Sequence, residues 1–118
     1  MLLLTGIPPF KENQMSNVPV YVVANLFVND PSIYREYEKG FFPLLKRHEG
    51  TFLTYDDNTF TFEGTSPPKG RMIIFMFPSE ANAKSWYEDA DYQALSAHRR
   101  DATKLEFLTM VRGLPPRN

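Results

Sequence analysis

The segment RMIIFMF, residues Arg71–Phe77, constrains the fold of this chain more than any other. Its β-branched and aromatic residues predict a strand, in which successive side chains point to opposite faces of a sheet. Large apolar side chains then lie on both faces: Ile73, Phe75 and Phe77 on one, and Met72, Ile74 and Met76 on the other. Since such a strand has to be covered on both faces, the fold must supply a covering layer on each side of its sheet.

Hydrophobic periodicity and turn residues divide the rest of the chain into alternating strands and helices. The predicted elements are a strand over Val20–Val28, a helix after Asp30-Pro31, a hairpin of Thr51–Tyr55 and Thr59–Gly64, the strand Arg71–Phe77, a helix from Ser79 to Glu88, a second capped by Asp91 and running to Ala102, and a last strand over Leu105–Arg112.

Four residues in or beside the first helix carry specific expectations. Asp30 is the predicted N-cap, ahead of a proline at the first helical position. Gly40 lies inside the helix and Pro43 lacks an amide donor, so we expect a break or kink near residues 40–42. Gly50 is the predicted left-handed residue that ends the helix.

This order of elements predicts an α+β fold, a ferredoxin-like βαββαβ antiparallel sheet with its helices on one face. The helices then leave the second apolar face of the sheet exposed. A patch of that kind marks an interaction surface, and most homo-oligomers are two-fold dimers. We therefore predict a homodimer in which two copies pack sheet to sheet.

The bulk composition bounds the class of protein. The chain has 118 residues, of which 42% are hydrophobic and 14% aromatic, enough for one domain with its own core. A net charge of -1 gives no bias toward nucleic acid or an anionic membrane, so neither is an expected partner. The absence of cysteine excludes disulfides, thiolate nucleophiles and cysteine-ligated metals. The apolar start, Met1–Leu4, is too short for a signal or a membrane span, so we expect a soluble, cytoplasmic protein.

The chain divides into a domain with short flanks. Residues 1–19 hold two adjacent prolines and no periodic pattern, which predicts a flexible leader, and Met15 is an alternative start of translation. Residues 20–113 form the predicted domain, and residues 114–118 form a tail.

Several stretches of the sequence together resemble the uncharacterised family called domain of unknown function 1330. They are NDPSIYREY, HEGTFL, FEGTSPPKGRMIIFMFPSEANAKSWYEDADYQALSAHRR and the closing VRG, within residues 20–113. The resemblance implies the dimeric α+β barrel superfamily, in agreement with the predicted dimer, and it brings no established activity. The family usually has a glycine pair where this chain has Glu49-Gly50, often an arginine where it has Thr51, and commonly a glutamate where it has Asp91.

Arg99 is the most informative candidate for a functional site. It shares an apolar stripe of the last helix with Tyr92 and Leu95, and a guanidinium in such a place needs an anionic partner or a route to water. We expect it to turn inward toward Asp30 or Glu63. A structural salt bridge is the preferred interpretation, and an anchor for an anionic ligand is the alternative.

The other candidates are polar or aromatic residues near the predicted pocket between helices and sheet. Asp30 is predicted to cap the helix, and a catalytic base is the alternative because Tyr34 and Tyr37 lie one and two turns away. The amide of Asn25 either lines a cavity or forms hydrogen bonds with a neighbouring backbone. The full set of ligand-pocket candidates is Asn25, Asp30, Tyr34, Tyr37, Glu63, Tyr87, Tyr92 and Arg99. His48 and His98 are too few for a metal or haem site, so no metal and no cofactor are expected, and catalytic residues stay unassigned.

Three functions remain open at this point. The first is a dimeric protein that binds a small molecule between its helices and its sheet, with or without a reaction. The second is a non-catalytic binding or structural module whose aromatic residues serve the core and the dimer interface. A haem-dependent protein is the third, and the histidines disfavour it. The sequence names no substrate.

Overall fold

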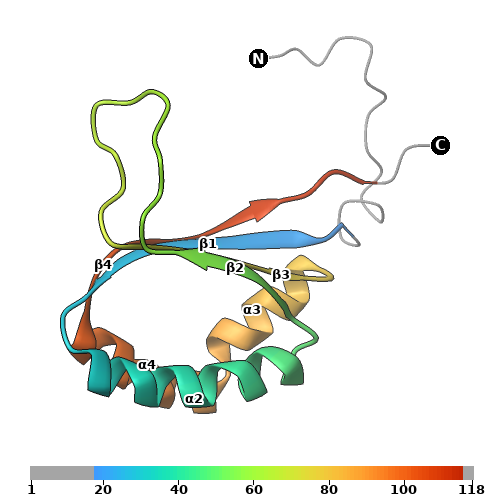
Figure 1. Ribbon diagram of the computed structural model, residues 1–118. Helices are drawn as coiled ribbons and strands as arrows, with labels where there is room; N and C mark the ends of the chain where they lie inside the picture. The colour runs from blue at the N-terminus through green and yellow to red at the C-terminus, as the bar shows by residue number, and fades with distance from the viewer. Residues whose placement is uncertain (1–17, 116–118) are drawn as a thin grey trace, which may run out of the picture.

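The computed structural model describes residues 18–115, and it confirms the predicted α+β fold. The elements are β1 (Val20–Val28), α2 (Pro31–Arg47), β2 (Thr51–Asp56), β3 (Arg71–Phe77), α3 (Glu80–Glu88), α4 (Ala90–Ala102) and β4 (Thr103–Arg112). The strands form one antiparallel sheet in the order β2-β3-β1-β4, the order of a ferredoxin-like fold. All three helices cover the same face of this sheet (Figure 1).

Helix α2 starts as predicted and is continuous as far as Arg47. Asp30 is its N-cap, and the Asp30 side chain accepts hydrogen bonds from the backbone N–H groups of Ser32 and Ile33, each at 3.1 Å. Of the break or kink predicted near residues 40–42, the break is wrong, because the helix runs without interruption through Gly40 and Pro43. Burial of the apolar stripe of α2 against the sheet outweighs the hydrogen bond that proline cannot make.

The left-handed residue after α2 is Glu49, and not the predicted Gly50. Glu49 has a φ of 64°, and the N–H of Gly50 donates to the carbonyl of Leu45 at 2.8 Å, which closes the helix end. Gly50 is needed for space instead: a Cβ there would overlap the side chain of Leu45 and lie 2.9 Å from Phe77.

The predicted hairpin is the largest error in the sequence-based fold. Its second strand, Thr59–Gly64, does not form; β2 pairs directly with β3, and residues 57–70 make a loop that rises from the sheet on the side away from the helices (Figure 1). Pairing with β3 places Phe52 beside Phe75 on the covered face. The alternating Phe60 and Phe62, which suggested the hairpin, instead remain 78% and 91% exposed.

Helices α3 and α4 meet at Asp89. Ser79 caps α3 as predicted, but α4 is capped by Asp89 rather than Asp91, since the carboxylate of Asp89 accepts from the N–H of Asp91 at 2.8 Å. The same carboxylate lies 2.7 Å from Nε2 of His48 and accepts from Arg47 at 3.0 Å. Asp89 therefore links the end of α2 to the α3–α4 junction.

The helices cover one face of the sheet and leave the other face uncovered (Figure 1). The helix-covered face carries the core, in which Val22 and Ala24 of β1 are buried beside Phe75 and Ile73 of β3. The opposite face, here called the helix-free face, carries eight apolar or aromatic side chains: Tyr21, Val23, Phe27, Met72, Ile74, Met76, Phe107 and Val111. The sequence-based conclusion that the helices cover only one of two apolar faces is correct.

Residues near both ends of the domain pack together. Val18 is fully buried, and the carbonyl of Pro19 accepts from the N–H of Gly113 at 2.8 Å, so these two residues pack with the domain although we had assigned them to the leader. The predicted leader over residues 1–17 and the last part of the tail, residues 116–118, lie outside the described residues. No helix within residues 18–115 is long and apolar enough to cross a membrane.

Candidate functional site

A cavity of about 270 Å³ lies between α2, α4 and the covered face of the sheet. Aromatic side chains make up much of its wall, namely Tyr34, Tyr37, Phe41, Phe42, Phe52, Tyr55 and Phe75. Smaller apolar residues complete it, and the charged members of the wall are Glu38, Arg71 and Arg99. Such a mixture of an apolar wall and a few polar groups is typical of small-molecule sites.

Two periodicities of the sequence build this wall. On α2, Tyr34, Tyr37 and Phe41 recur at helical spacing and therefore face the sheet together. On β3, the alternating Ile73 and Phe75 point at them from the covered face. Phe41 lies edge-on to Phe75, with ring centroids 5.2 Å apart.

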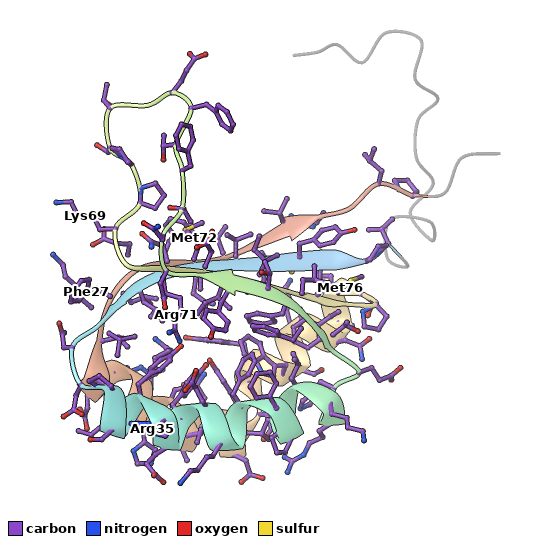
Figure 2. All side chains as sticks on the ribbon, viewed as in Figure 1. Phe27, Arg35, Lys69, Arg71, Met72 and Met76 are labelled. Atoms are coloured by element: carbon purple, nitrogen blue, oxygen red, sulfur yellow. The ribbon has the colours of Figure 1, made fainter. Side chains whose placement is uncertain are left out.

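Arg71 is a cation of the cavity wall whose charge is already neutralised. Its side chain points from the sheet toward α2 (Figure 2). It donates to the carboxylate of Asp57 at 2.6 and 3.0 Å and to Glu38 at 3.3 Å, and it stacks 4.3 Å from the centre of the Tyr55 ring. The guanidinium holds the pKa of Asp57 below its usual value. Sequence analysis missed Arg71, although an arginine at the start of an apolar central strand was a signal.

Arg99 is buried as predicted, but the predicted ion pair is wrong. Its exposed fraction is 4%, and no carboxylate of the described chain lies within ion-pairing distance of its guanidinium. Its Nε atom is buried without a hydrogen-bond partner. The ring of Tyr37, whose centre lies 5.9 Å from Cζ of Arg99, gives a cation–π contact. Arg99 faces inward because it shares the buried stripe of α4 with Tyr92 and Ala102.

The two expected partners of Arg99 lie elsewhere. The carboxylate of Asp30 caps α2. Hydrogen bonds from the N–H of Ile33 and the hydroxyl of Ser32 hold the pKa of Asp30 below its usual value. Glu63 is exposed on the loop formed by residues 57–70. Both are distant from Arg99 along the chain, and the sequence pattern contained no information on their separation in space.

Tyr34 and Tyr37 are protonated residues of the cavity wall. The hydroxyls of Tyr37 and Tyr92 lie 2.7 Å apart in a buried hydrogen bond. Burial raises the pKa of Tyr34 to about 12, and burial together with Tyr92 raises the pKa of Tyr37 well above its usual value. At neutral pH the hydroxyls of Tyr34 and Tyr37 therefore donate or accept hydrogen bonds and do not act as bases.

Asn25 has a structural role. It is 2% exposed, and its amide nitrogen donates to the carbonyls of Lys69 at 2.8 Å and Arg71 at 3.1 Å. Of the two roles expected for it, meeting a neighbouring backbone is the correct one. Asn25 thereby fixes the base of the loop formed by residues 57–70, outside the cavity wall.

A second hollow, of about 620 Å³, lies between α3, α4 and β4 and is more open than the first. Its wall includes Tyr87, which is 42% exposed, and Trp86, whose indole Nε1 is buried without a hydrogen-bond partner. Arg99 contributes to the walls of both spaces. Of the eight candidates, Tyr34, Tyr37 and Arg99 meet at the first cavity, and Tyr87 meets Arg99 at the second.

The fold and the aromatic cavity define the class: a small α+β protein with a ferredoxin-like antiparallel sheet and a partly open aromatic cavity between its helices and that sheet. The model of the family called Domain of unknown function (DUF1330) matches residues 19–114, so the chain belongs to that family. No curated protein is significantly similar to it in sequence.

Solved structures with a similar fold come from several bacteria. A protein of unknown function from Rhodopseudomonas palustris is 19% identical, with a TM-score of 0.69 and coverage of 93% of this chain and 98% of its own. SnoaB, a cofactor-independent oxygenase from Streptomyces nogalater, is 10% identical, with a TM-score of 0.57 and coverage of 86% and 96%. A proposed antibiotic biosynthesis monooxygenase from Caulobacter crescentus is 20% identical, with a TM-score of 0.52 and coverage of 87% and 96%. At these identities the likeness shows the fold alone.

Proposed function

We propose that this protein binds a small molecule with one or two aromatic rings in the cavity between α2, α4 and the sheet. The observation that carries the proposal is the cavity itself, 270 Å³ of space inside an aromatic core. Protein interiors are close-packed, and an unfilled apolar cavity lowers stability. An engineered apolar cavity of about 150 Å³ binds benzene, so the space suits a somewhat larger ring system.

The similar structures support a role in binding without specifying a reaction. One is described as a cofactor-independent oxygenase and one as a proposed monooxygenase, so the fold occurs in proteins that act on small molecules. In this chain the hydroxyls of Tyr34 and Tyr37 are protonated at neutral pH, and Glu38 pairs with Arg71. The proposal is therefore for binding, in the cytoplasm as the sequence suggested, and it names no reaction.

The working form in this proposal is a homodimer that packs through the helix-free face. Phe27 and Val111 of this face are 53% and 51% exposed in the single chain. Each large apolar side chain that becomes buried contributes about 1.5–3 kcal/mol, so a second copy packed on this face gains considerable stability. The cavity lies on the helix side of the sheet, away from this interface.

The dimer is tested by light scattering at micromolar concentration. We expect about twice the chain mass of 13.7 kDa. Ile74→Lys, at the centre of the helix-free face, should produce monomers because a buried charge is costly. Arg35→Glu, a charge change on the solvent side of α2 (Figure 2), should leave the dimer intact. A wild-type protein of single-chain mass would refute the dimer.

Binding is tested with a library of aromatic fragments, read by ligand-observed NMR and by thermal shift. Ala24 is 3% exposed and faces the cavity, so Ala24→Phe fills that space with a ring. We expect the hits of the wild-type protein to be lost in Ala24→Phe. Ala97→Phe adds the same ring at an exposed position of α4 and should keep them.

Two results would contradict the binding proposal. One is a set of hits with equal affinity for the wild-type protein and a folded Ala24→Phe variant. The other is a wild-type protein that binds no fragment at all. That second result would favour the alternative function, a structural module whose aromatic residues, such as the packed pair of Phe75 and Trp86, serve only the core.

A further inference from the structure

We propose that the ligand of this cavity carries one carboxylate, which Arg99 binds, and that the ligand class is therefore small aromatic carboxylates. This inference rests on the proposed function, because it adds a chemical class to the same cavity. It depends on a different observation, the state of Arg99, which is the one buried arginine among residues 18–115.

Arg99 is a charge that lacks a counterion. It is 96% buried, since its exposed fraction is 4%, and within residues 18–115 no acidic side chain pairs with it. A guanidinium keeps its charge under all physiological conditions, so burial cannot be relieved by loss of a proton. A buried charge is stable only when it is paired or hydrogen-bonded. The stacking distance of 5.9 Å to the ring of Tyr37 provides at most a weak substitute.

The other charges of the cavity wall are already matched. Arg71 binds Asp57 through two nitrogens and Glu38 through a third, so both nearby carboxylates are held by this one cation. Arg99 is the remaining cation of the wall. A ligand with a single negative charge balances it, whereas a phosphate monoester would bring a second charge with no partner in this wall.

The geometry of the guanidinium and the shape of the cavity both suit an aromatic carboxylate. A guanidinium presents parallel N–H donors that match the two oxygens of a carboxylate. Beside it, the rings of Phe41 and Phe75 offer edges and faces to a flat apolar body, in the arrangements that aromatic pairs prefer. The cavity therefore fits a molecule that is aromatic along most of its length and anionic at the end near α4.

The second hollow also borders Arg99 and has to be distinguished from the first. Its other cations do not need a ligand, since Lys84 pairs with Glu80 at 2.7 Å and the charge of Arg100 is exposed to water. It is also wider and more open, so it encloses a small flat ligand less completely. Variants that fill one space at a time separate the two. Ala24 borders only the first, and Met110 borders only the second.

The test compares 2-naphthoate with its neutral amide, 2-naphthamide, by titration calorimetry on the full chain. We expect the wild-type protein to bind naphthoate at least about tenfold more tightly than the amide, which corresponds to about 1.4 kcal/mol. Arg99→Met should lower the affinity for naphthoate to that for the amide and leave the amide unchanged. Arg99→Lys keeps the charge without the parallel donors and should lie between, and it serves if the methionine variant does not fold.

The ligand-free proteins give a second readout. Removing an unpaired buried charge should raise the melting temperature of Arg99→Met relative to the wild-type protein. A structural ion pair would instead make the same variant less stable. Ala24→Phe should abolish the binding of both probes, and Met110→Trp should preserve it.

The outcomes separate this inference from the proposed function. Equal affinity of the wild-type protein for naphthoate and naphthamide overturns the carboxylate assignment and leaves the binding cavity standing. The same holds if naphthoate fails to bind while other aromatic fragments do, or if Met110→Trp rather than Ala24→Phe removes naphthoate binding. A wild-type protein that binds neither these probes nor any fragment overturns the proposed function itself.

Discussion

Replacing Glu49 by glycine should stabilise this protein. Glu49 is the residue after the C-cap of α2 and has a φ of 64°, in the left-handed region. A side chain with a Cβ is strained there, whereas glycine is not. The side chain of Glu49 is exposed and forms no ion pair in the described part of the chain, so its removal breaks no ion pair.

The size of the effect follows from two opposing terms. Left-handed backbone costs a residue with a Cβ about 1–2 kcal/mol. Glycine loses more conformational entropy on folding, which reduces this gain in stability by about 0.5–1 kcal/mol. The net change in the free energy of unfolding should therefore be an increase of about 0.5–1 kcal/mol. One kcal/mol shifts the melting temperature of a domain of this size by about 4–8 °C.

Calorimetry or urea unfolding measures this change, with all variants at the same protein concentration because a dimer's stability depends on it. Glu49→Ala is the matched control: it also removes the carboxylate but keeps the Cβ, so it should not stabilise. Gly50→Ala, one residue further, should destabilise, because its Cβ would overlap Leu45 and crowd Phe77. If Glu49→Ala raises the stability as much as Glu49→Gly does, the argument from backbone strain is refuted.

Three further predictions concern buried hydrogen bonds and acid stability. Asn25→Ala should lower the stability by about 1–3 kcal/mol, because two backbone carbonyls lose their donor, and should speed proteolysis within residues 57–70. Tyr37→Phe should cost about 1 kcal/mol, because the buried hydroxyl of Tyr92 loses its partner. A hydrogen bond from His48 lowers the pKa of Asp89 from 3.8 to about 2, and one from Arg112 lowers the pKa of Glu80 from 4.5 to about 2. The melting temperature should therefore fall as the pH drops from about 4.5 to 2.

The sign of the pH effect follows from the direction of these shifts. A carboxylate with a lowered pKa stabilises the fold above the pKa of the unfolded chain, and that stability is lost as it becomes protonated in the folded state. Asp89→Asn should therefore give a shallower acid transition than the wild-type protein, and an unchanged slope would contradict the assignment. Uncut residues 57–70 in Asn25→Ala, or a Tyr37→Phe variant as stable as the wild-type protein, would contradict the other two.

Sequence reasoning located most of the elements because they depend on local signals. Asp30 before Pro31 marks a helix start through hydrogen bonds between residues that are close in the chain. The alternation of apolar residues in β3 fixed which side chains share a face. The prediction from sequence failed where two segments could pair with the same strand. Phe60 and Phe62 alternate with polar residues as in a strand, yet β2 pairs with β3 instead. The prediction also placed the cap of α4 at Asp91 when Asp89 stands two residues earlier.

The candidate site shows the same difference between local signals and tertiary packing. That Arg99 faces inward was set by the sequence, because helical periodicity places it on the buried stripe with Tyr92. The sequence also determined that the sheet is apolar on both faces, since strand alternation is a local property. Which groups surround Arg99 was decided only by the tertiary structure, which keeps Asp30 and Glu63 away and brings Tyr37 near. Periodicity fixes the direction of a side chain, but the identity of its neighbours depends on how elements distant in the chain pack together.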